Sequence, residues 1–250
     1  MAKRVELKTP AEIEKMRVAG KLLREVFNEL DRAVEPGIST AELDRIARKL
    51  IEDGGARPAF LGYHGFPATL CTSVNEEVVH GIPNDSALVD GDIVSVDCGL
   101  VLDGFYADSA TTYPVGDISP KAEKLLRVTR ESLYKAIDQM LVGTHIGTVS
   151  HAVQKHAEAA GFSIVRDYTG HGIGRAMHEA PQVPNFGNPG AGFKLMAGLV
   201  LAIEPMVNIG THRTKTLADG WTVVTLDSAL SAHFEHTIAV TEDGPVILTA

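Results

Sequence analysis

The chain has 250 residues, of which 44% are hydrophobic and 22% are charged, a composition typical of one large globular domain or two small ones. Its formal net charge of -9 argues against general binding to nucleic acid, which requires a positive surface. There is no apolar run of about eighteen residues and no apolar core of a signal peptide near residue 1, so we expect no membrane span and no export. Two cysteines are too few for a disulfide framework, so a cytoplasmic, soluble protein is the default expectation. We also expect a monomer.

Four segments have the spacing of amphipathic helices. Thr9-Pro10 predicts the start of the first helix, and Ser39-Thr40 predicts the start of a second, which Gly54-Gly55 ends. Helical spacing of apolar residues returns over residues 120–140 and again over residues 148–160.

The segments between and after these helices are typical of strands and loops. Residues 60–83 are aromatic and interrupted by glycine, which predicts loop and short strand. Residues 94–113, VSVDCGLVLDGFYADSATTY, predict a β-hairpin that turns at Asp103-Gly104. From Gly198 onward, strands are predicted over LVLAIEPMV, WTVVTLD and HFEHTIAVTEDG.

The sequence contains an internal repeat. Gly37 matches Gly143 and Gly55 matches Gly161 at one offset, and each helix pair is followed by strands that carry acidic residues. The alternative explanation is chance similarity between amphipathic helices, but the matched order of the acids favours a duplication. We predict a single α+β domain over residues 1–250, with halves of helix, helix, strand and strand over about 9–117 and 118–250. A pseudo-twofold axis would relate these halves around a central antiparallel sheet.

Each half brings two carboxylates to its strands, Asp97 and Asp108 in the first half and Glu204 and Glu235 in the second. If the hairpin turns at Asp103-Gly104, Gly99 lies opposite Asp108 and Asp97 lies on the same face, with an empty space between the two carboxylates. Such carboxylates repel each other unless they share a proton, meet a basic side chain or bind a cation. No Lys or Arg occurs in residues 94–113, and four converging acids favour metal, with two ions bridged by shared oxygens.

Histidines add a nitrogen ligand to this set. In TGHGIGRAMHEAP the glycines follow G-x-G-x-G and not the dinucleotide-binding pattern, and His171 lies between two of them. His80, His171 and His178 each lie in a glycine-rich, loop-like segment. One imidazole among carboxylates suits Mn, Fe, Co or Zn better than Ca or Mg.

Together these motifs resemble those of the type I methionine aminopeptidases, from about Thr9 to the end of the chain. The motifs that carry the resemblance are NEEVVHGIP, DGDIVSVDCG, DGFYADSATTY, GHGIGRAMHEAP, AIEPM, DGWTVVTLD and FEHTIAVTEDG. The resemblance implies the pita-bread fold and a hydrolase that removes the initiator methionine from nascent proteins when the second residue is small. It also implies two divalent ions, with Co, Mn, Fe and Zn as the candidates, held by Asp97, Asp108, His171, Glu204 and Glu235.

Further site residues are implied by the same resemblance. His80 and His178 would contact the substrate and help move protons, and Glu204 would act as the general base. The methionine pocket would be lined by Phe60, Tyr63, Phe66, Cys71, Met177 and Trp221. Met177 stands where relatives usually have an aromatic residue, and Phe66 stands where tyrosine is common, so we expect a changed pocket shape with specificity kept. For Phe60 and Cys71, an ordinary place in the core is the competing interpretation.

A monovalent cation held by backbone oxygens at Asn75, Glu77 and Ser231 is implied by the resemblance alone. The expected partners are nascent polypeptide N-termini, with a ribosome contact suggested by function. A basic patch at Lys121, Lys124, Arg127 and Arg130 is one candidate for that contact, and a solvated helix face is the simpler interpretation.

Two other functions remain to be weighed. A proline-directed peptidase of the same fold would usually carry an additional N-terminal domain, for which this chain has no room. A non-catalytic binding protein of the same fold would have lost metal ligands, whereas all five candidate ligands are present here.

Overall fold

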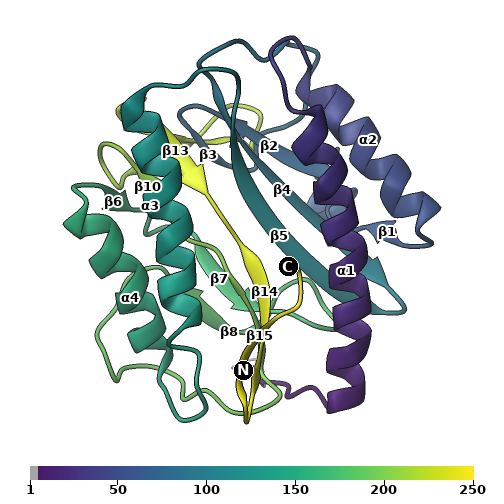
Figure 1. Ribbon diagram of the computed structural model, residues 1–250, viewed down its shortest axis with the longest axis vertical. Helices are drawn as coiled ribbons and strands as arrows, with labels where there is room; N and C mark the ends of the chain where they lie inside the picture. Colours follow the sequence, from purple (N-terminus) through teal and green to yellow (C-terminus); the bar gives the residue numbers. More distant parts are fainter. Residues whose placement is uncertain (1–4) are drawn as a thin grey trace.

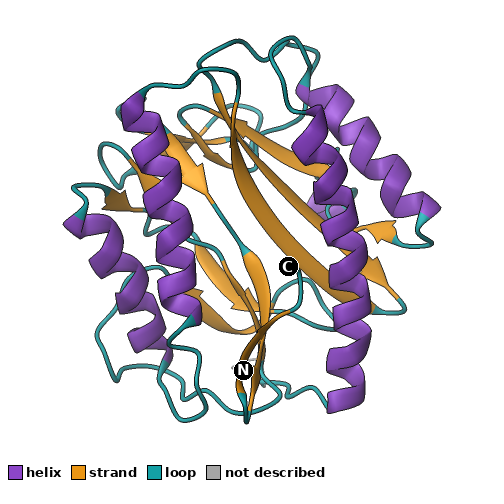
Figure 2. Ribbon diagram, in the orientation of Figure 1, coloured by secondary structure: helices purple, strands orange, loops and turns teal. Residues whose placement is uncertain are grey.

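A computed structural model describes residues 5–250 of the chain. It has four helices, α1 (Pro10–Ala33), α2 (Thr40–Asp53), α3 (Pro120–Ile137) and α4 (Ile146–Ala159). The helix pairs α1–α2 and α3–α4 lie on the same side of the strands, one pair on each side of strand β14 (His236–Thr241) (Figure 1). The antiparallel strands form a curved layer behind them (Figure 2). This α+β arrangement is the one that the sequence predicts.

The first helix begins where the sequence predicts. The backbone N–H of Glu12 donates to the Thr9 hydroxyl, and the N–H of Thr9 donates to the Glu12 carboxylate at 2.7 Å. This capping box satisfies helix N–H groups that have no partner within the helix. Pro10 at the first helical position costs nothing there, because its missing N–H would have no helical partner.

The two helix pairs have matching ends, as the predicted repeat requires. Gly37 and Gly143, which precede the second helix of each pair, have φ values of +100° and +90°. Gly55 and Gly161, which follow the second helices, have φ values of +75° and +86°. Only glycine adopts these angles without a steric penalty, so the repeat matches in backbone conformation as well as in residue type. The division into halves at residues 117 and 118 stays a prediction.

Two predicted helix bounds are wrong by a few residues. α3 ends at Ile137 and not at Met140, because the N–H groups of Gln139 and Met140 form tight turns to the carbonyls of Ala136 and Ile137. Met140 is nevertheless fully buried, so the apolar spacing continues beyond the helix. α4 begins at Ile146 and not at Thr148. The N–H of Ile146 has no partner within the helix and donates to the carbonyl of Phe193.

The predicted hairpin is confirmed in its register. β4 (Ile93–Leu102) and β5 (Phe105–Pro114) pair with Leu102 opposite Phe105 and Gly99 opposite Asp108. The space beside Gly99 is not empty, however. A Cβ at Gly99 would lie 2.9 Å from the ring of Phe60 and 3.2 Å from Asp108 Oδ1, so the ring of Phe60 takes this space.

Two further strands extend the sheet of the hairpin. β1 (Arg57–Pro58) and β2 (Leu70–Val74) pair one after the other with the edge of β4 that faces away from β5. A three-stranded sheet has the order β11–β12–β3, formed by Thr214–Thr216, Val223–Thr225 and Glu77–Val79.

The strand predicted over residues 199–207 is two strands. β9 (Val200–Ile203) and β10 (Met206–Asn208) belong to different sheets, because Glu204-Pro205 interrupts the ladder and Pro205 has no N–H to donate. β9 lies in the sheet β15–β14–β9–β7–β8, whose other strands are Gly244–Ile247, His236–Thr241, Thr169–Gly172 and Glu179–Pro184. β10 pairs with β13 (Ser231–His233) and β6 (Ser163–Ile164). Glu204 therefore lies where the chain passes from one sheet to another.

Within residues 5–250, no helix is both long and apolar enough to traverse a lipid bilayer.

Candidate metal centre

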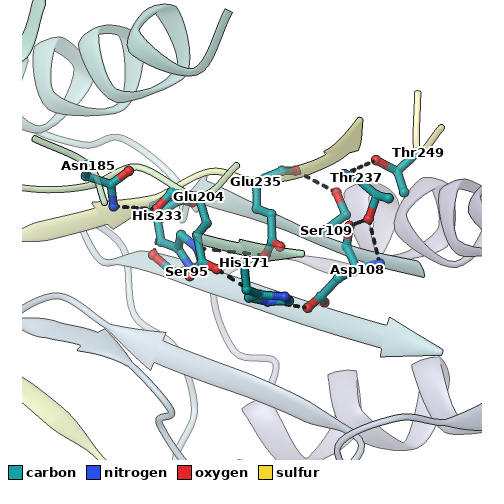
Figure 3. A network of polar contacts seen from close by, with 11 residues as sticks. Ser95, Asp108, Ser109, His171, Asn185, Glu204, His233, Glu235, Thr237 and Thr249 are labelled. Carbon is teal, nitrogen blue, oxygen red and sulfur yellow. Dashed lines mark hydrogen bonds and ion pairs between the residues drawn. The ribbon is translucent and has the colours of Figure 1, made fainter. Parts of the chain in front are cut away.

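The five predicted metal ligands come from separate segments of the chain and line one cavity. Asp97 lies on β4, Asp108 on β5 and His171 on β7. Glu204 directly follows β9, and Glu235 lies between β13 and β14. Figure 3 shows Asp108, His171, Glu204 and Glu235 directed toward one another.

A single backbone bridge joins the two halves at this point. The N–H of Glu235 donates to the carbonyl of Ala110 at 2.9 Å, and the N–H of Ala110 donates back at 3.3 Å. The Ser109 hydroxyl also donates to the Glu235 carbonyl at 2.8 Å. Thr237 Oγ1 accepts from the N–H of Asp108 at 3.0 Å and donates to its carbonyl at 2.8 Å. The backbones of Asp108 and Glu235 are thereby fixed beside each other.

His171 is oriented for coordination. Its Nδ1 lies 2.9 Å from the carbonyl of Gly172, and a carbonyl only accepts, so Nδ1 carries the proton. Burial lowers the pKa of His171 to about 4, which leaves the imidazole neutral near pH 7. Its Nε2, with a lone pair, lies 3.5 Å from Glu204 Oε1 and 4.0 Å from Asp108 Oδ2. This is the tautomer that binds a metal through Nε2.

The carboxylates carry a large electrostatic cost when no cation is bound. Asp108 is 3% exposed and Glu235 is 2% exposed. Burial raises the pKa of Asp108, Glu204 and Glu235 well above the usual range, and the charges of the neighbouring acids raise each of them further. Burial also raises the pKa of Asp97. Among the described residues, no lysine or arginine forms an ion pair with any of the four.

The cluster fits divalent metal. One ligand atom each of Asp108, His171 and Glu235 lies within 4.8 Å of the others. Three buried oxygens, Asp97 Oδ1, Asp108 Oδ1 and Glu235 Oε1, have no hydrogen-bond partner among the described residues. Buried oxygens without partners are costly, and a cation in their midst removes that cost. Carboxylate oxygens with one neutral imidazole are a donor set for Mn, Fe, Co or Zn.

The cluster lines a cavity of about 470 Å3. All thirteen site residues expected from the sequence line it: Phe60, Tyr63, Phe66, Cys71, His80, Asp97, Asp108, His171, Met177, His178, Glu204, Trp221 and Glu235. The structure thus brings together every residue singled out, while their individual roles stay predictions.

Part of the cavity wall is apolar. Phe66, Cys71 and Met177 are buried in one cluster, and Trp221 packs against it. The rings of Phe66 and Trp221 meet edge to face, with centroids 5.1 Å apart. Burial and the charge of Asp97 raise the pKa of the Cys71 thiol, so this sulfur is a neutral part of the wall.

Two further histidines, His80 and His178, line the cavity. His178 is exposed, its Nδ1 lies 2.8 Å from the Tyr63 hydroxyl, and its ring centroid lies 4.2 Å from that of His171. His80 is half-buried, has a φ of +62° and contacts the ring of Tyr168 edge to face. Burial lowers the pKa of His80 to about 4, so it is neutral near pH 7.

Sequence reasoning missed His64, Val79, Tyr168, Thr169 and His233, which also line the cavity. His233 is the most notable of these, since its buried Nε2 has no hydrogen-bond partner among the described residues and lies 3.9 Å from Glu235 Oε2. The available signal was its position two residues before Glu235, because alternate residues of an extended chain share a face. His171 was expected in a loop and lies on β7, since the glycines beside it pack closely within the sheet and do not break the strand.

The suggested monovalent cation site stays a prediction. The carbonyl of Asn75 accepts from the N–H of Ser231 at 2.9 Å, so two of the suggested residues are neighbours. The carboxylate of Glu77 accepts from the N–H of Val74 at 2.8 Å.

Comparison with known proteins agrees with this centre. The model of metallopeptidase family M24 matches residues 14–242. The methionine aminopeptidase of Clostridium perfringens is 58% identical over 97% of this chain and 98% of its own length. Methionine aminopeptidase 1 of Bacillus subtilis is 54% identical, with the same coverage of each chain. The crystal structure of methionine aminopeptidase from Thermotoga maritima superposes with a TM-score of 0.97 at 47% identity and covers 98% of this chain and 99% of that one. A pita-bread fold with a cluster of four carboxylates and an imidazole, together with this identity over nearly the full length, shows that the chain belongs to metallopeptidase family M24 and to its methionine aminopeptidases.

Proposed function

We propose that this chain removes the initiator methionine from nascent polypeptides whose second residue is small. The observation that carries the proposal is the layout of the cavity. Cys71, Met177 and Trp221 form an apolar part of the wall of the same cavity that the five candidate ligands line. Sulfur and aromatic edges make favourable contacts with a thioether, so a methionine side chain placed there would put its own peptide bond at the metal centre.

The five ligands would hold two divalent ions, with Co, Mn, Fe and Zn as the candidates. When bound, such ions polarise the scissile carbonyl, activate a water and bind the free α-amino group of the substrate, which accounts for exopeptidase action. The resemblance implies that Asp108 and Glu235 would be shared by both ions, and the neighbouring positions of their backbones at Ala110 and Thr237 support that role.

The protein's own residues would handle the protons. The side chain of Glu204 is 14% exposed, so it faces the cavity while it lies at the metal cluster. In that position Glu204 would take the proton of the attacking water and deliver it to the leaving amine. His178, held by the Tyr63 hydroxyl, would hydrogen-bond the carbonyl oxygen as it gains charge. His80, a neutral imidazole, would hydrogen-bond the scissile nitrogen.

Hydrolysis of two tripeptides tests this function. Metal-stripped protein titrated with Mn(II) or Co(II) should cleave Met-Ala-Ser and leave Leu-Ala-Ser largely intact, because the pocket is shaped for an unbranched side chain. Asp97→Ala should remove this activity. Cleavage of Xaa-Pro dipeptides without cleavage of Met-Ala-Ser would instead favour a proline-directed peptidase.

The partners and location follow from the substrate. We propose a cytoplasmic monomer that meets nascent chains at the ribosome. The basic residues of α3 give this contact no support, since Lys124 bonds to the carbonyl of Ala160 and Arg127 pairs with Glu131. These contacts favour a solvated helix face. Co-sedimentation with ribosomes over a range of salt concentrations tests the contact.

A further inference from the structure

We propose that Lys8 is a positioning residue for this reaction. Acting through Glu179, it fixes the loop of residues 174–179, which carries Met177 to the pocket and His178 to the substrate. The inference rests on the proposed function for its kinetic consequences. Its structural part stands on the contacts of Lys8 alone.

Lys8 is a buried lysine whose backbone N–H and side-chain ammonium both donate hydrogen bonds. The residue is 6% exposed, and its backbone N–H donates to the carbonyl of Gly198 at 2.6 Å. Its Nζ donates to the carboxylate of Glu179 and, at 3.3 Å, to the carbonyl of Glu6. The side chains of the pair are 3% and 11% exposed. Burying both charges is costly, so neither is tolerated here without the other.

The carboxylate of Glu179 also closes the loop on itself. Its Oε1 accepts from the N–H of Arg175 at 2.7 Å and from the N–H of Ala176 at 3.1 Å. One carboxylate therefore joins the start of the loop to its end, and Lys8 neutralises that carboxylate from outside the loop. Met177 and His178 lie between the points that are joined.

Lys8 also packs directly against the first residue of the loop. A Cβ at Gly174 would lie 2.1 Å from Lys8 Cε and 2.6 Å from Lys8 Nζ. Gly174 does not have a positive φ, so its lack of a side chain serves this close approach and not an unusual backbone angle. The backbone of Gly174 is tied to the hairpin as well, since its carbonyl accepts from the N–H of Tyr106 at 2.8 Å.

A second and more exposed contact supports the same loop. Arg175 pairs with Glu12 of α1, and its guanidinium lies 4.8 Å from the ring centroid of Phe105. The Arg175 side chain is 59% exposed, so solvent screens this pair and we expect it to contribute less than the Lys8–Glu179 pair.

The loop is the part of the site that depends on Lys8. Loss of the lysine charge leaves the Glu179 carboxylate buried without a counter-charge, and the loop is then expected to shift until that carboxylate reaches water. Such a shift would displace Met177 and His178 together. The five metal ligands lie outside residues 174–179, so metal binding should be unaffected.

The main experiment compares Lys8→Met, Lys8→Arg and Arg24→Met in the full chain. Arg24→Met is the matched control, because it breaks an ion pair with Asp31 outside the cavity. Lys8→Met should lower kcat/KM for Met-Ala-Ser by up to about 100-fold, with a rise in KM and a fall in kcat, while Mn(II) affinity stays within about twofold of wild type. Lys8→Arg should recover most of the loss, and Arg24→Met should behave as wild type.

Three results would overturn the proposal. The first is a Lys8→Met variant with wild-type kcat/KM, the second is a loss of activity matched by an equal loss of Mn(II) affinity, and the third is an equal loss of activity in Arg24→Met.

Amide hydrogen exchange measures the stability of the loop independently of enzyme activity. The amides of Arg175 and Ala176 should exchange at least about tenfold faster in Lys8→Met, and unchanged exchange rates would also contradict the proposal. If the wild-type protein cleaves no methionine peptide, the proposed function fails, while this exchange result still decides the structural inference.

Gly174→Ala tests independently whether the Lys8 side chain packs against the loop. In the wild-type background the added methyl group meets the lysine side chain, and we expect a clear loss of activity and of thermal stability. In a Lys8→Ala background the same substitution should add little further loss. Equal effects of Gly174→Ala in the two backgrounds would show that Lys8 does not pack against the loop as described.

Discussion

The backbones of Ala110 and Glu235 exchange hydrogen bonds in both directions, at 2.9 and 3.3 Å. This pair joins the hairpin of the first half to the strands of the second half. Asp108 lies two residues before Ala110 and therefore shares its face of β5. One backbone bridge between the halves thus places the carboxylate-bearing residues Asp108 and Glu235 side by side.

Metal removal should destabilise the folded protein. Without a cation the buried carboxylates of Asp97, Asp108, Glu204 and Glu235 repel one another and leave oxygens without partners. At a Mn(II) concentration 100 times its Kd, binding at each site should add about 2.7 kcal/mol to the free energy of unfolding. Thermal unfolding of chelated and Mn(II)-loaded protein measures this difference, and an unchanged Tm would contradict the assignment.

Met177→Ala should widen the pocket and weaken discrimination. Met177 is 2% exposed and packs in the aromatic cluster, so truncation should cost about 2–5 kcal/mol in stability. The kcat/KM for Met-Ala-Ser should fall by about 10–200-fold, since the substrate side chain loses contacts. Steady-state kinetics with Met-Ala-Ser and Leu-Ala-Ser measure the effect. If the ratio of kcat/KM for the two peptides stays at its wild-type value, Met177 does not contact the substrate side chain.

His80→Asn should change how stability depends on pH. Burial lowers the pKa of His80 to about 4 from an ordinary 6.5, so between these values the unfolded chain binds a proton that the folded chain does not. Folding stability is therefore lost as the pH falls from about 6.5 toward 4. Asn tolerates the positive φ of this position and has no such titration.

The comparison between wild type and this variant isolates the effect of His80. From pH 7 to pH 5, His80→Asn should gain up to about 1 kcal/mol relative to wild type, a figure reduced because the side chain is half-exposed. Urea denaturation of the metal-free proteins at both pH values gives this number. If the free energy of unfolding falls equally in the two proteins from pH 7 to pH 5, His80 titrates in the folded protein as it does in the unfolded chain.

Gly20→Ala should destabilise the protein although alanine is the better helix former. A Cβ at Gly20 would lie 2.0 Å from the carbonyl oxygen of Leu248, so α1 packs against the C-terminal backbone there. Overpacking of this kind costs about 1–3 kcal/mol. Chemical denaturation beside the exposed control Val18→Ala measures it, and a stabilised Gly20→Ala would contradict the close packing.

Local signals in the sequence predicted much of the fold. The hairpin register follows from Asp103-Gly104, because a two-residue turn fixes every pair behind it. The helix starts follow from capping residues such as Thr9. The break at Glu204-Pro205 was not predicted, since apolar residues continue on both sides of it and only the pairing partners reveal the change of sheet.

The site was predictable where it depends on residue type and less so where it depends on tertiary contact. Four acids in apolar strands are unusual enough to indicate a metal centre. His233 and Lys8 are not unusual in this way, because a histidine in a strand and a lysine before a helix are ordinary in sequence. His233 is marked only by its place two residues before Glu235, whereas the role of Lys8 comes from Glu179, a partner distant along the chain.

The central claim is that five side chains hold two divalent ions beside a methionine pocket. The most direct test is a calorimetric titration of metal-stripped protein with Mn(II), with hydrolysis of Met-Ala-Ser measured at each point, for wild type and Asp108→Asn. The account predicts two ions per chain in wild type, cleavage that rises with their binding, and at least about a 100-fold loss of both affinity and activity in the variant. Mn(II) binding or hydrolysis that Asp108→Asn leaves unchanged would contradict it.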